Sequence, residues 1–320
     1  MSAIADKVAF LFPGQGSQQV GMGRELYETY PLAREIFDEA DSILGFSLSR
    51  LCFDGPAETL TDTVNAQPAI FTTSIACRRA LESLEPEVFP SPSFVAGHSL
   101  GEYSALTAAG ALDFADGLRL VRERGRLMKL AGERSPGGMA AILGLGDAAV
   151  EQACEQARRE TGAIVQAANY NAPGQIVISG DNEALERAMA LLQEAGARKV
   201  VRLAVSIAAH SPLMACIVDE FRQAVESTPL RNPSIPVVAN ITARPVESVA
   251  AIHEEMVGQL TSPVRWVASM QHVLEQDVKI FVELGSGKVL TGLLKRISRQ
   301  TKRVNVRNPA DLEKLEEGEL

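Results

Sequence analysis

The chain has 320 residues, more than one hydrophobic core usually holds, so we expect two domains or a large domain with a smaller one inserted. The formal net charge is −9 and only 5% of residues are aromatic, which argues against nucleic-acid binding, a function that needs a basic surface and stacking platforms. No apolar stretch is long enough to cross a bilayer and no signal-peptide core is found, so we expect a cytoplasmic protein without a membrane partner.

Short apolar runs that stop at proline or glycine predict buried strands of a sheet covered on both faces. These runs are 8–12, 94–96 and 279–284. Helical patterns fill much of the chain between them, at 26–44, 68–84, 101–109 and 115–132. Strands that alternate with helices are typical of an α/β domain with a largely parallel sheet.

A glycine-rich loop follows the first predicted strand, because residues 12–18 read Phe-Pro-Gly-Gln-Gly-Ser-Gln. The loop is not a P-loop, since no Gly-Lys-Ser/Thr follows it. It remains either a phosphate-cradling loop, a simple turn, or a loop that lends a backbone N–H to an oxyanion hole.

The second predicted strand ends in a nucleophile-elbow motif. Residues 97–101 read Gly-His-Ser-Leu-Gly, which fits G-x-S-x-G with Ser99 at its centre. A short apolar run precedes the motif and a helical pattern of small residues follows it, which favours an elbow over a plain glycine-rich turn. Ser99 is then expected at a helix N-terminus, where backbone N–H groups stabilise an oxyanion. We therefore predict that Ser99 is a nucleophile.

Residues 135–206 have a different rhythm and predict an inserted subdomain. The strands are expected at 138–145, 163–168, 175–179 and 199–205, and the helices at 147–161 and 181–195. Asp181 is expected to cap the second helix and Gly196 to close it. The order β-α-β-β-α-β is ferredoxin-like. The flanks, 1–134 and 207–320, are then expected to build a large catalytic α/β domain.

A serine hydroxyl needs a base, and the chain has four histidines. His253 and His272 lie in polar helical patterns and are expected in solvent. His98 directly precedes Ser99, where it can tune the site but is poorly placed as a base. His210 follows an apolar segment, at a strand end or loop. On spacing alone it is either the base or a buried structural histidine.

Ordered motifs along nearly the whole chain carry a resemblance. They are 12–18 (FPGQGSQ), 65–69 (NAQPA), 97–106 (GHSLGEYSAL), 124–125 (RG), 171–175 (NAPGQ), 205–210 (VSIAAH), Gln259 with 263–264 (PV), and 283–288 (ELGSGK). With these motifs the chain resembles the malonyl-CoA:acyl-carrier-protein transacylases of type II fatty acid synthesis. It is equally similar to the freestanding acyltransferases that serve some polyketide synthases. The resemblance implies an α/β-hydrolase-like (patatin-like) core with a parallel sheet and an inserted ferredoxin-like subdomain.

The resemblance also implies a role for each matching position. Ser99 is the nucleophile, His210 is the base, and Arg124 holds the free carboxylate of the malonyl group. Arginine suits that task because its planar fork pairs bidentately with a carboxylate. Without the resemblance, Arg124 reads as a surface charge on an arginine-rich helix. The other roles fall to Gln259, whose backbone carbonyl orients the histidine, to Gln15 and Leu100, whose N–H groups form the oxyanion hole, and to His98 and Gln67, which line the site.

Ala209 departs from the pattern, because many malonyl-specific relatives have a bulky phenylalanine there and others have serine. A small residue leaves more room near the α-carbon of the substrate. The resemblance therefore implies the transfer reaction, but with Ala209 it implies the exclusion of methylmalonyl groups less strongly.

The implied partners are malonyl-CoA and an acyl carrier protein, with neither cofactor nor metal; the four cysteines form no C-x-x-C motif. Carrier proteins of this kind are acidic, so a chain of net charge −9 needs a local basic patch to attract them. Residues 295–303 hold five positive charges and no acid. The alternative is a solvated helix face. The expected docking residues are Lys295, Arg296, Arg198 and Lys199.

Two other functions remain open. A serine esterase or thioesterase uses the same elbow but carries an acid between its serine and histidine, whereas Asp147 and Asp181 look like helix caps here. A carrier-binding module without activity is the second alternative. The sequence does not separate fatty acid from polyketide synthesis.

Overall fold

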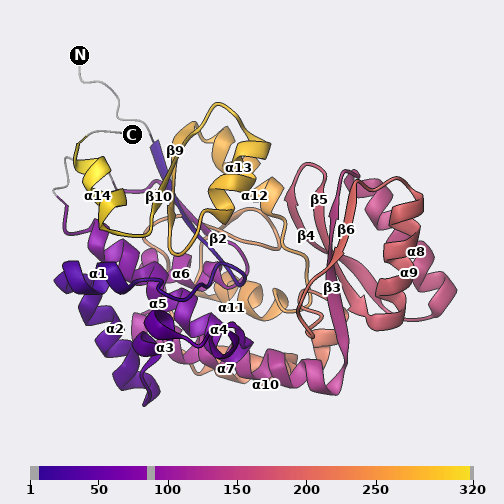
Figure 1. Cartoon of the computed structure of the whole chain (residues 1–320), viewed down its shortest axis with the longest axis horizontal. Helices are drawn as coiled ribbons and strands as arrows, with labels where there is room; N and C mark the ends of the chain where they lie inside the picture. Colours follow the sequence, from indigo (N-terminus) through magenta and orange to yellow (C-terminus); the bar gives the residue numbers. More distant parts are fainter. Residues whose placement is uncertain (1–6, 85–90, 318–320) are drawn as a thin grey trace.

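The computed structural model describes residues 7–84 and 91–317. Its larger sheet has six strands in the order β10-β9-β1-β2-β7-β8 (Figure 1). Every neighbouring pair is parallel except β7 with β8. The strands are β1 (Lys7–Phe12), β2 (Phe94–Gly97), β7 (Val237–Val238), β8 (Pro245–Val246), β9 (Val278–Leu284) and β10 (Lys302–Val306). The prediction of an α/β fold with a parallel sheet is confirmed.

Helices surround this sheet in two layers. The helices before the second sheet are α1 (Arg24–Thr29), α2 (Pro31–Leu44), α3 (Leu48–Asp54), α4 (Ala57–Thr61), α5 (Thr63–Leu81), α6 (Gly101–Ala108) and α7 (Phe114–Arg134). Those after it are the 3₁₀ segment η1 (Pro212–Ile217), α10 (Val218–Glu226), α11 (Val249–Gly258), α12 (Trp266–Glu275), α13 (Val289–Ile297) and α14 (Pro309–Glu316).

Strand β1 is apolar from Val8 to Phe12 because both of its faces are covered. Val8, Phe10 and Phe12 join one core, which α1 to α7, α10, α11 and α14 complete. Ala9 and Leu11 join a second core with α12 and α13 on the opposite face. Successive side chains of a strand point to opposite faces, so a doubly covered strand loses the polar alternation of a half-exposed one.

Two predicted helices have different bounds. The pattern at 26–44 is broken at Tyr30, which is extended (φ −109°, ψ 115°) because the ring of Pro31 disfavours a helical residue before it. Helix α5 begins at Thr63, five residues before the predicted start at Pro68, and Pro68 lies inside it. Proline cannot donate to the carbonyl four residues earlier, and Arg122 Nη1 donates to that carbonyl of Val64 instead, at 3.1 Å.

The smaller sheet is antiparallel throughout, in the order β4-β5-β3-β6, and lies beside the larger one (Figure 1). Its elements are β3 (Gly137–Leu143), α8 (Asp147–Thr161), β4 (Val165–Ala172), β5 (Gln175–Asp181), α9 (Asn182–Glu194) and β6 (Lys199–Arg202). Helices α8 and α9 cover one face and close a separate core. The other face carries Met139, Val177 and Leu203, which belong to a small apolar cluster.

Several details of this part differ from the prediction. Strand β6 ends at Arg202 rather than at 205, and β4 continues to Ala172 rather than ending at 168. Asp181 precedes α9, but its side chain accepts a hydrogen bond from the N–H of Ile164 (2.7 Å) instead of capping the helix. None of the described helices is long and apolar enough to cross a membrane.

Candidate active site

The elbow that holds Ser99 turns sharply from β2 into α6. Ser99 has a positive φ of 51°, which few residues other than glycine adopt. The flanking glycines are required by space: a Cβ on Gly97 would lie 1.9 Å from the carbonyl of Gly101, and one on Gly101 would lie 2.0 Å from the carbonyl oxygen of Phe12. The predicted elbow geometry is therefore present, with Ser99 two residues before the start of α6 at Gly101.

Asn240, which sequence reasoning did not select, clamps the elbow. Its Oδ1 accepts a hydrogen bond from the N–H of Ser99 and its Nδ2 donates to the carbonyl of Gly97, both at 2.7 Å. Its own N–H donates to Glu102 Oε1 at 3.0 Å. These bonds hold Ser99 in its strained conformation, and they leave the Ser99 N–H unavailable to an oxyanion.

His210 lies against Ser99, although 111 positions separate them in the chain. Its Nε2 is 2.8 Å from Ser99 Oγ, and its Nδ1 is 2.9 Å from the backbone carbonyl of Gln259. A carbonyl only accepts, so Nδ1 carries the proton and Nε2 is left as the acceptor toward Ser99. Burial, together with the charge of Arg124, lowers the pKa of His210 from 6.5 to about 3. The imidazole is therefore neutral at neutral pH, with the Nε2 lone pair available to accept a proton.

Arg124 is buried in α7, with 1% of its surface exposed, and is not a surface charge as its sequence context allowed. Its Nη1 donates to Gln67 Oε1 (3.0 Å) and its Nη2 donates to Gln259 Oε1 (2.8 Å) and to Ser99 Oγ (3.2 Å). The guanidinium also lies over the ring of Tyr103, 5.5 Å from its centroid.

No described carboxylate lies within ion-pair distance of Arg124, whereas Arg119 and Arg126 of the same helix pair with acids at the surface. Burial lowers the pKa of the guanidinium, yet an arginine stays protonated in proteins. A buried cation with only neutral partners is a strong site for an incoming carboxylate.

The two predicted oxyanion donors lie in different loops: Leu100 in the elbow and Gln15 in the loop after β1, which lines the same cavity as Ser99. Leu100 follows Ser99 and is fully buried, whereas Gln15 is exposed and its Nε2 donates to Thr63 Oγ1 (3.0 Å). Among the described residues, neither backbone N–H donates to a protein acceptor. Both are thus free for an oxygen in the cavity.

His98 and Gln67 touch the site without reaching Ser99 Oγ. His98 Nε2 lies 2.8 Å from Asn171 Oδ1, and its ring meets Trp266 edge-on at 5.4 Å. Burial lowers the pKa of His98. Gln67 binds Arg124 as described, and its Nε2 lies 3.3 Å from Met128 Sδ. His98 lines the cavity that contains Ser99, whereas Gln67 is fully buried behind Arg124 and is not among the residues that line it.

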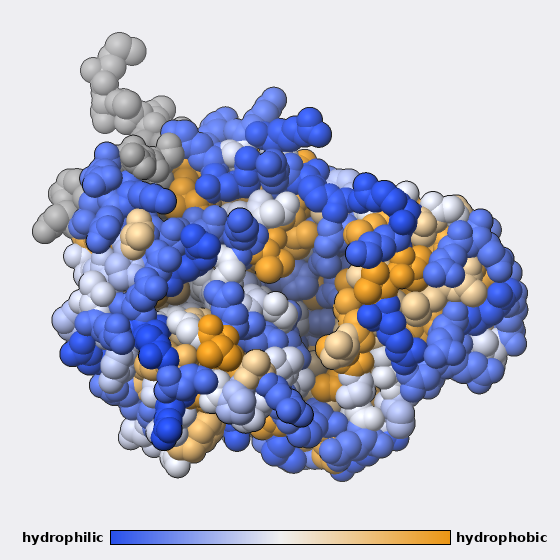
Figure 2. All heavy atoms as spheres, in the orientation of Figure 1, coloured by the Kyte–Doolittle hydropathy of each residue, from blue (hydrophilic) through white to orange (hydrophobic). Residues whose placement is uncertain are grey.

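These groups meet at the base of a cavity of about 450 Å³ between the two sheets. Figure 2 shows the molecule hollowed there, with apolar side chains on the rim. The polar groups at the base are Ser99, His98, His210 and Arg124. Met139 and Val177 of the smaller sheet, with Leu203, Val205 and Ala209 of the segment that follows β6, form an apolar wall of the cavity.

The predicted docking residues lie at one edge of the two sheets. Arg296 Nη2 donates to the carbonyl of Pro173 (2.8 Å), and its Nη1 donates to Gln175 Oε1, so it reaches the turn between β4 and β5. In the smaller sheet, Leu143 of β3 pairs with Gln175 of β5 on one side and with Lys199 of β6 on the other. Lys199 is therefore two strands away from Gln175, the residue that Arg296 binds. All four side chains are exposed: Lys295, Arg296, Arg198 and Lys199.

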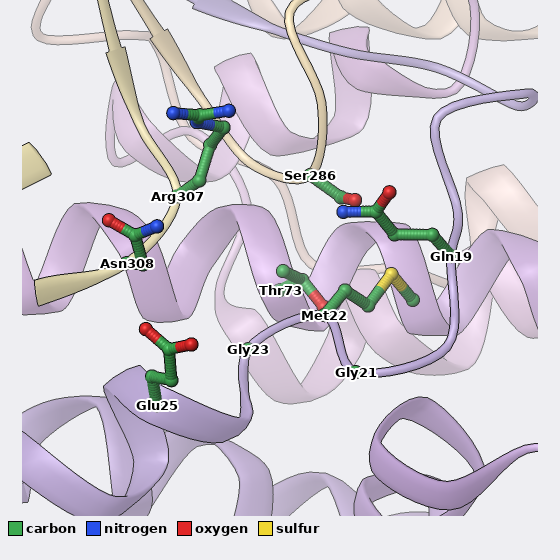
Figure 3. A pocket seen from close by; sticks show the side chains of 9 residues that line it. All are labelled: Gln19, Gly21, Met22, Gly23, Glu25, Thr73, Ser286, Arg307 and Asn308. Atoms are coloured by element: carbon green, nitrogen blue, oxygen red, sulfur yellow. The ribbon is translucent and has the colours of Figure 1, made fainter.

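A second, smaller cavity of about 130 Å³ lies where β1, β9 and β10 end. Figure 3 shows the side chains of Gln19 and Ser286 pointing toward one another across it. Arg307 also lines this cavity and pairs with Asp311 at 2.9 Å. None of the predicted site residues lines it, so it has no part in the predicted chemistry.

Comparisons with known proteins identify relatives over nearly the whole chain. The acyl transferase domain model matches residues 9–312. The malonyl CoA-acyl carrier protein transacylase of Bacillus subtilis (strain 168) is 46% identical over 307 residues, which cover 96% of this chain and 95% of that protein. The solved acyl carrier protein S-malonyltransferase of Vibrio cholerae superposes with a TM-score of 0.91 at 41% identity, over 96% of this chain and 99% of the other.

A further solved structure is a complex, described as a type II PKS acyl-carrier protein with its malonyl-transacylase. It superposes with a TM-score of 0.93 at 39% identity, over 98% of this chain and 99% of the other.

Proposed function

The chain belongs to the acyl transferase family of malonyl-CoA:acyl-carrier-protein transacylases, and on this premise we propose that Ser99 carries the malonyl group between the two substrates. The enzyme transfers the malonyl group from malonyl-CoA to the phosphopantetheine thiol of an acyl carrier protein. The observation that carries the assignment of residues is a buried Arg124, 3.2 Å from Ser99 Oγ, that has no ion-pair partner among the residues the structure describes.

In the proposed first half-reaction, Ser99 Oγ attacks the thioester carbonyl while His210 Nε2 takes the hydroxyl proton. The oxyanion receives hydrogen bonds from the N–H groups of Gln15 and Leu100, each worth on the order of 10²–10³ in rate. Collapse expels the CoA thiolate, which takes the proton from His210. The carrier thiol then repeats these steps in reverse order on the malonyl-Ser99 ester.

The Gln259 carbonyl does the work of a triad aspartate in this scheme. It fixes the imidazole tautomer but stabilises imidazolium less than a carboxylate does. That suffices for a thioester, whose leaving group is better than an amine. The scheme uses no metal and no cofactor, since its serine, imidazole and N–H groups supply every step.

A serine thioesterase is the less favoured alternative, because a hydrolase for uncharged acyl groups gains nothing from Arg124. Initial-rate kinetics decide between the two. Transfer through malonyl-Ser99 predicts parallel double-reciprocal plots when malonyl-CoA and carrier protein are varied, whereas release of free malonate at a rate independent of the carrier would contradict transfer.

The low pKa of His210 predicts a flat acid limb. Because the base is neutral above about pH 3, kcat/KM for Ser99 acylation should not halve near pH 6.5, where an ordinary histidine protonates. The unfolded chain binds a proton at this histidine below about pH 6.5 and the folded chain only near pH 3, so stability should fall as the pH falls through that window. Stopped-flow measurement of Ser99 acylation down to about pH 5 checks the kinetic prediction, and a half-maximal rate near pH 6.5 would contradict it.

The small side chain of Ala209 predicts weak discrimination against branched acyl groups. Ala209 lines the apolar wall of the cavity, so a phenylalanine there should fill space near the substrate α-carbon. One methyl group in a pocket is worth about 1–3 kcal/mol, so Ala209→Phe should raise the malonyl-to-methylmalonyl ratio by about two hundredfold at most. The ratio of kcat/KM for the two CoA esters measures this, and an unchanged ratio would show that residue 209 does not face the α-carbon.

We also propose that Lys295, Arg296, Arg198 and Lys199 form the docking surface for the acidic carrier protein. The contact of Arg296 with the turn at Pro173 supports a single basic edge shared by both sheets. Reversal of Lys295 and Arg296 to glutamate should raise the apparent KM for carrier protein severalfold, with a smaller effect on Ser99 acylation.

The KM for carrier protein should also rise with salt, because the Debye length shortens from about 10 Å at 0.1 M to about 3 Å at 1 M. Charge reversal at Arg159, an exposed arginine on α8, is a matched control. An unchanged KM at low salt in the double variant would locate docking elsewhere.

The finer fold assignment is likewise a proposal. A ferredoxin-like subdomain over 135–206, inserted into a patatin-like, α/β-hydrolase-like domain built from 1–134 and 207–320, is supported by the order β4-β5-β3-β6 and by the helices on one face. The cytoplasmic location stays a prediction of the sequence.

A further inference from the structure

Gln259 is hydrogen-bonded to all three of the main residues of the site, His210, Arg124 and Ser99. Its backbone carbonyl binds His210, and its side-chain Oε1 accepts from Arg124. Its Nε2 donates to the carbonyl of Ser99 at 3.1 Å and to Glu102 Oε2. Both ends of the amide are therefore used, and the side chain is fully buried.

An amide group fits its pocket in two orientations that differ only in exchanging oxygen and nitrogen. In the observed orientation Oε1 faces the guanidinium of Arg124. In the reversed one Nε2 would face it, and two donors would oppose each other in a buried site. The neighbours of Gln259 must therefore decide which orientation persists.

The carboxyl group of Glu102, a residue that is 2% exposed, determines the orientation of the Gln259 amide. Glu102 Oε1 accepts from the backbone N–H of Asn240 and Glu102 Oε2 accepts from Gln259. The first donor is fixed in the backbone, so the second oxygen is held toward Gln259. An acceptor at that point admits only Nε2, which turns Oε1 toward Arg124.

Glu255 lies beside Glu102 and interacts with its carboxyl, and Glu255 Oε1 accepts from the N–H of Ile241 at 2.9 Å. Burial and the neighbouring carboxyl raise the pKa of Glu102 well above its usual range. Two interacting buried carboxyls hold one proton between them at lowest cost, because two like charges repel each other there. Such a proton leaves Glu102 Oε1 and Oε2 as acceptors toward Asn240 and Gln259, which is the arrangement the hydrogen bonds show.

We propose that Glu102 is a positioning residue for substrate selection, which orients the Gln259 amide so that Arg124 is held where the substrate carboxylate meets it. The inference rests on the proposed role of Arg124. It goes beyond that role because Glu102 touches no substrate and acts through Gln259.

Glu102→Gln tests the inference with almost no change in size. A glutamine at this position has one acceptor oxygen for two donors, so either Asn240 or Gln259 meets an N–H group. The Asn240 donor is backbone and cannot turn, so the Gln259 amide gives way and Arg124 loses an acceptor. Ser99 acylation by malonyl-CoA should fall about tenfold to a hundredfold, with acylation by acetyl-CoA within about threefold of the wild type.

Glu255→Gln is the matched control, since Glu255 is a buried acid beside Glu102 that binds Gln259 only through its backbone carbonyl, which the variant keeps. Without the neighbouring carboxyl, Glu102 still offers both oxygens as acceptors. Glu255→Gln should leave the malonyl-to-acetyl ratio within about threefold. In an Arg124→Ala background, Glu102→Gln should change the ratio no further, because its effect passes through Arg124. Equal loss of both acylations, or the same change of ratio without Arg124, would overturn the inference.

Gln259→Met gives a second route should Glu102→Gln fail to fold. It keeps the backbone carbonyl that binds His210 and removes the amide, so it should lower the malonyl-to-acetyl ratio as Glu102→Gln does; an unchanged ratio would overturn the link. The proposed function fails separately, if the wild type is not acylated by malonyl-CoA or if Arg124→Ala keeps the malonyl preference.

Discussion

Arg124→Ala is expected to reverse the acyl preference of the enzyme. The substrate carboxylate loses a charge-assisted pair worth about 1.5–3 kcal/mol or more, so malonyl transfer should fall at least tenfold to a hundredfold. Acetyl transfer has no carboxylate to lose and should be kept or rise. The kcat/KM values for malonyl-CoA and acetyl-CoA, measured with one carrier protein, give the ratio directly.

Two companion variants separate this effect from general damage. Arg124→Lys keeps the charge but not the planar fork, so it should recover only part of the malonyl preference. Arg126→Ala removes an exposed arginine of the same helix, which pairs with Glu123, and should leave the ratio unchanged. If both acyl transfers fall equally in Arg124→Ala, the arginine is structural.

Ser99→Ala is expected to abolish transfer while the protein stays folded. The change removes the only oxygen that becomes esterified, and loss of the nucleophile in serine enzymes costs on the order of 10⁶ in rate. The elbow itself should survive, because Asn240 binds the backbone of residues 97 and 99 rather than the hydroxyl.

The control for Ser99→Ala is Ser104→Ala, a buried serine of α6. It should keep wild-type transfer, and thermal unfolding should show that both variants are folded. Transfer at a wild-type rate by Ser99→Ala would require another nucleophile.

The elbow could be predicted because its requirements are local. Glycines stand at the two positions where a Cβ would strike backbone, and the strand before them is apolar because both faces of the sheet are covered. The helix break at Tyr30 could also be predicted, since the chain has a proline directly after it. The start of α5 could not be predicted locally, because Arg122, from another helix, donates to the Val64 carbonyl that Pro68 leaves without a donor.

The rest of the site depends on contacts across the chain that no local pattern contains. Asn240 lies 141 positions from Ser99 and stands in a loop without a motif. Arg124 looks like its exposed neighbours until the fold buries it. Glu102 did leave a signal, as a lone acid in a helix of small and apolar residues, and burial of such an acid implies a polar partner.

The most direct test of the account is the mass of the intact protein after mixing with malonyl-CoA in the absence of carrier protein. We expect the wild type to gain one malonyl group, on the peptide that contains Ser99, and to lose it when holo carrier protein is added. Ser99→Ala should gain nothing. An unmodified wild type, or an adduct that persists in Ser99→Ala, would contradict transfer through a malonyl ester on Ser99.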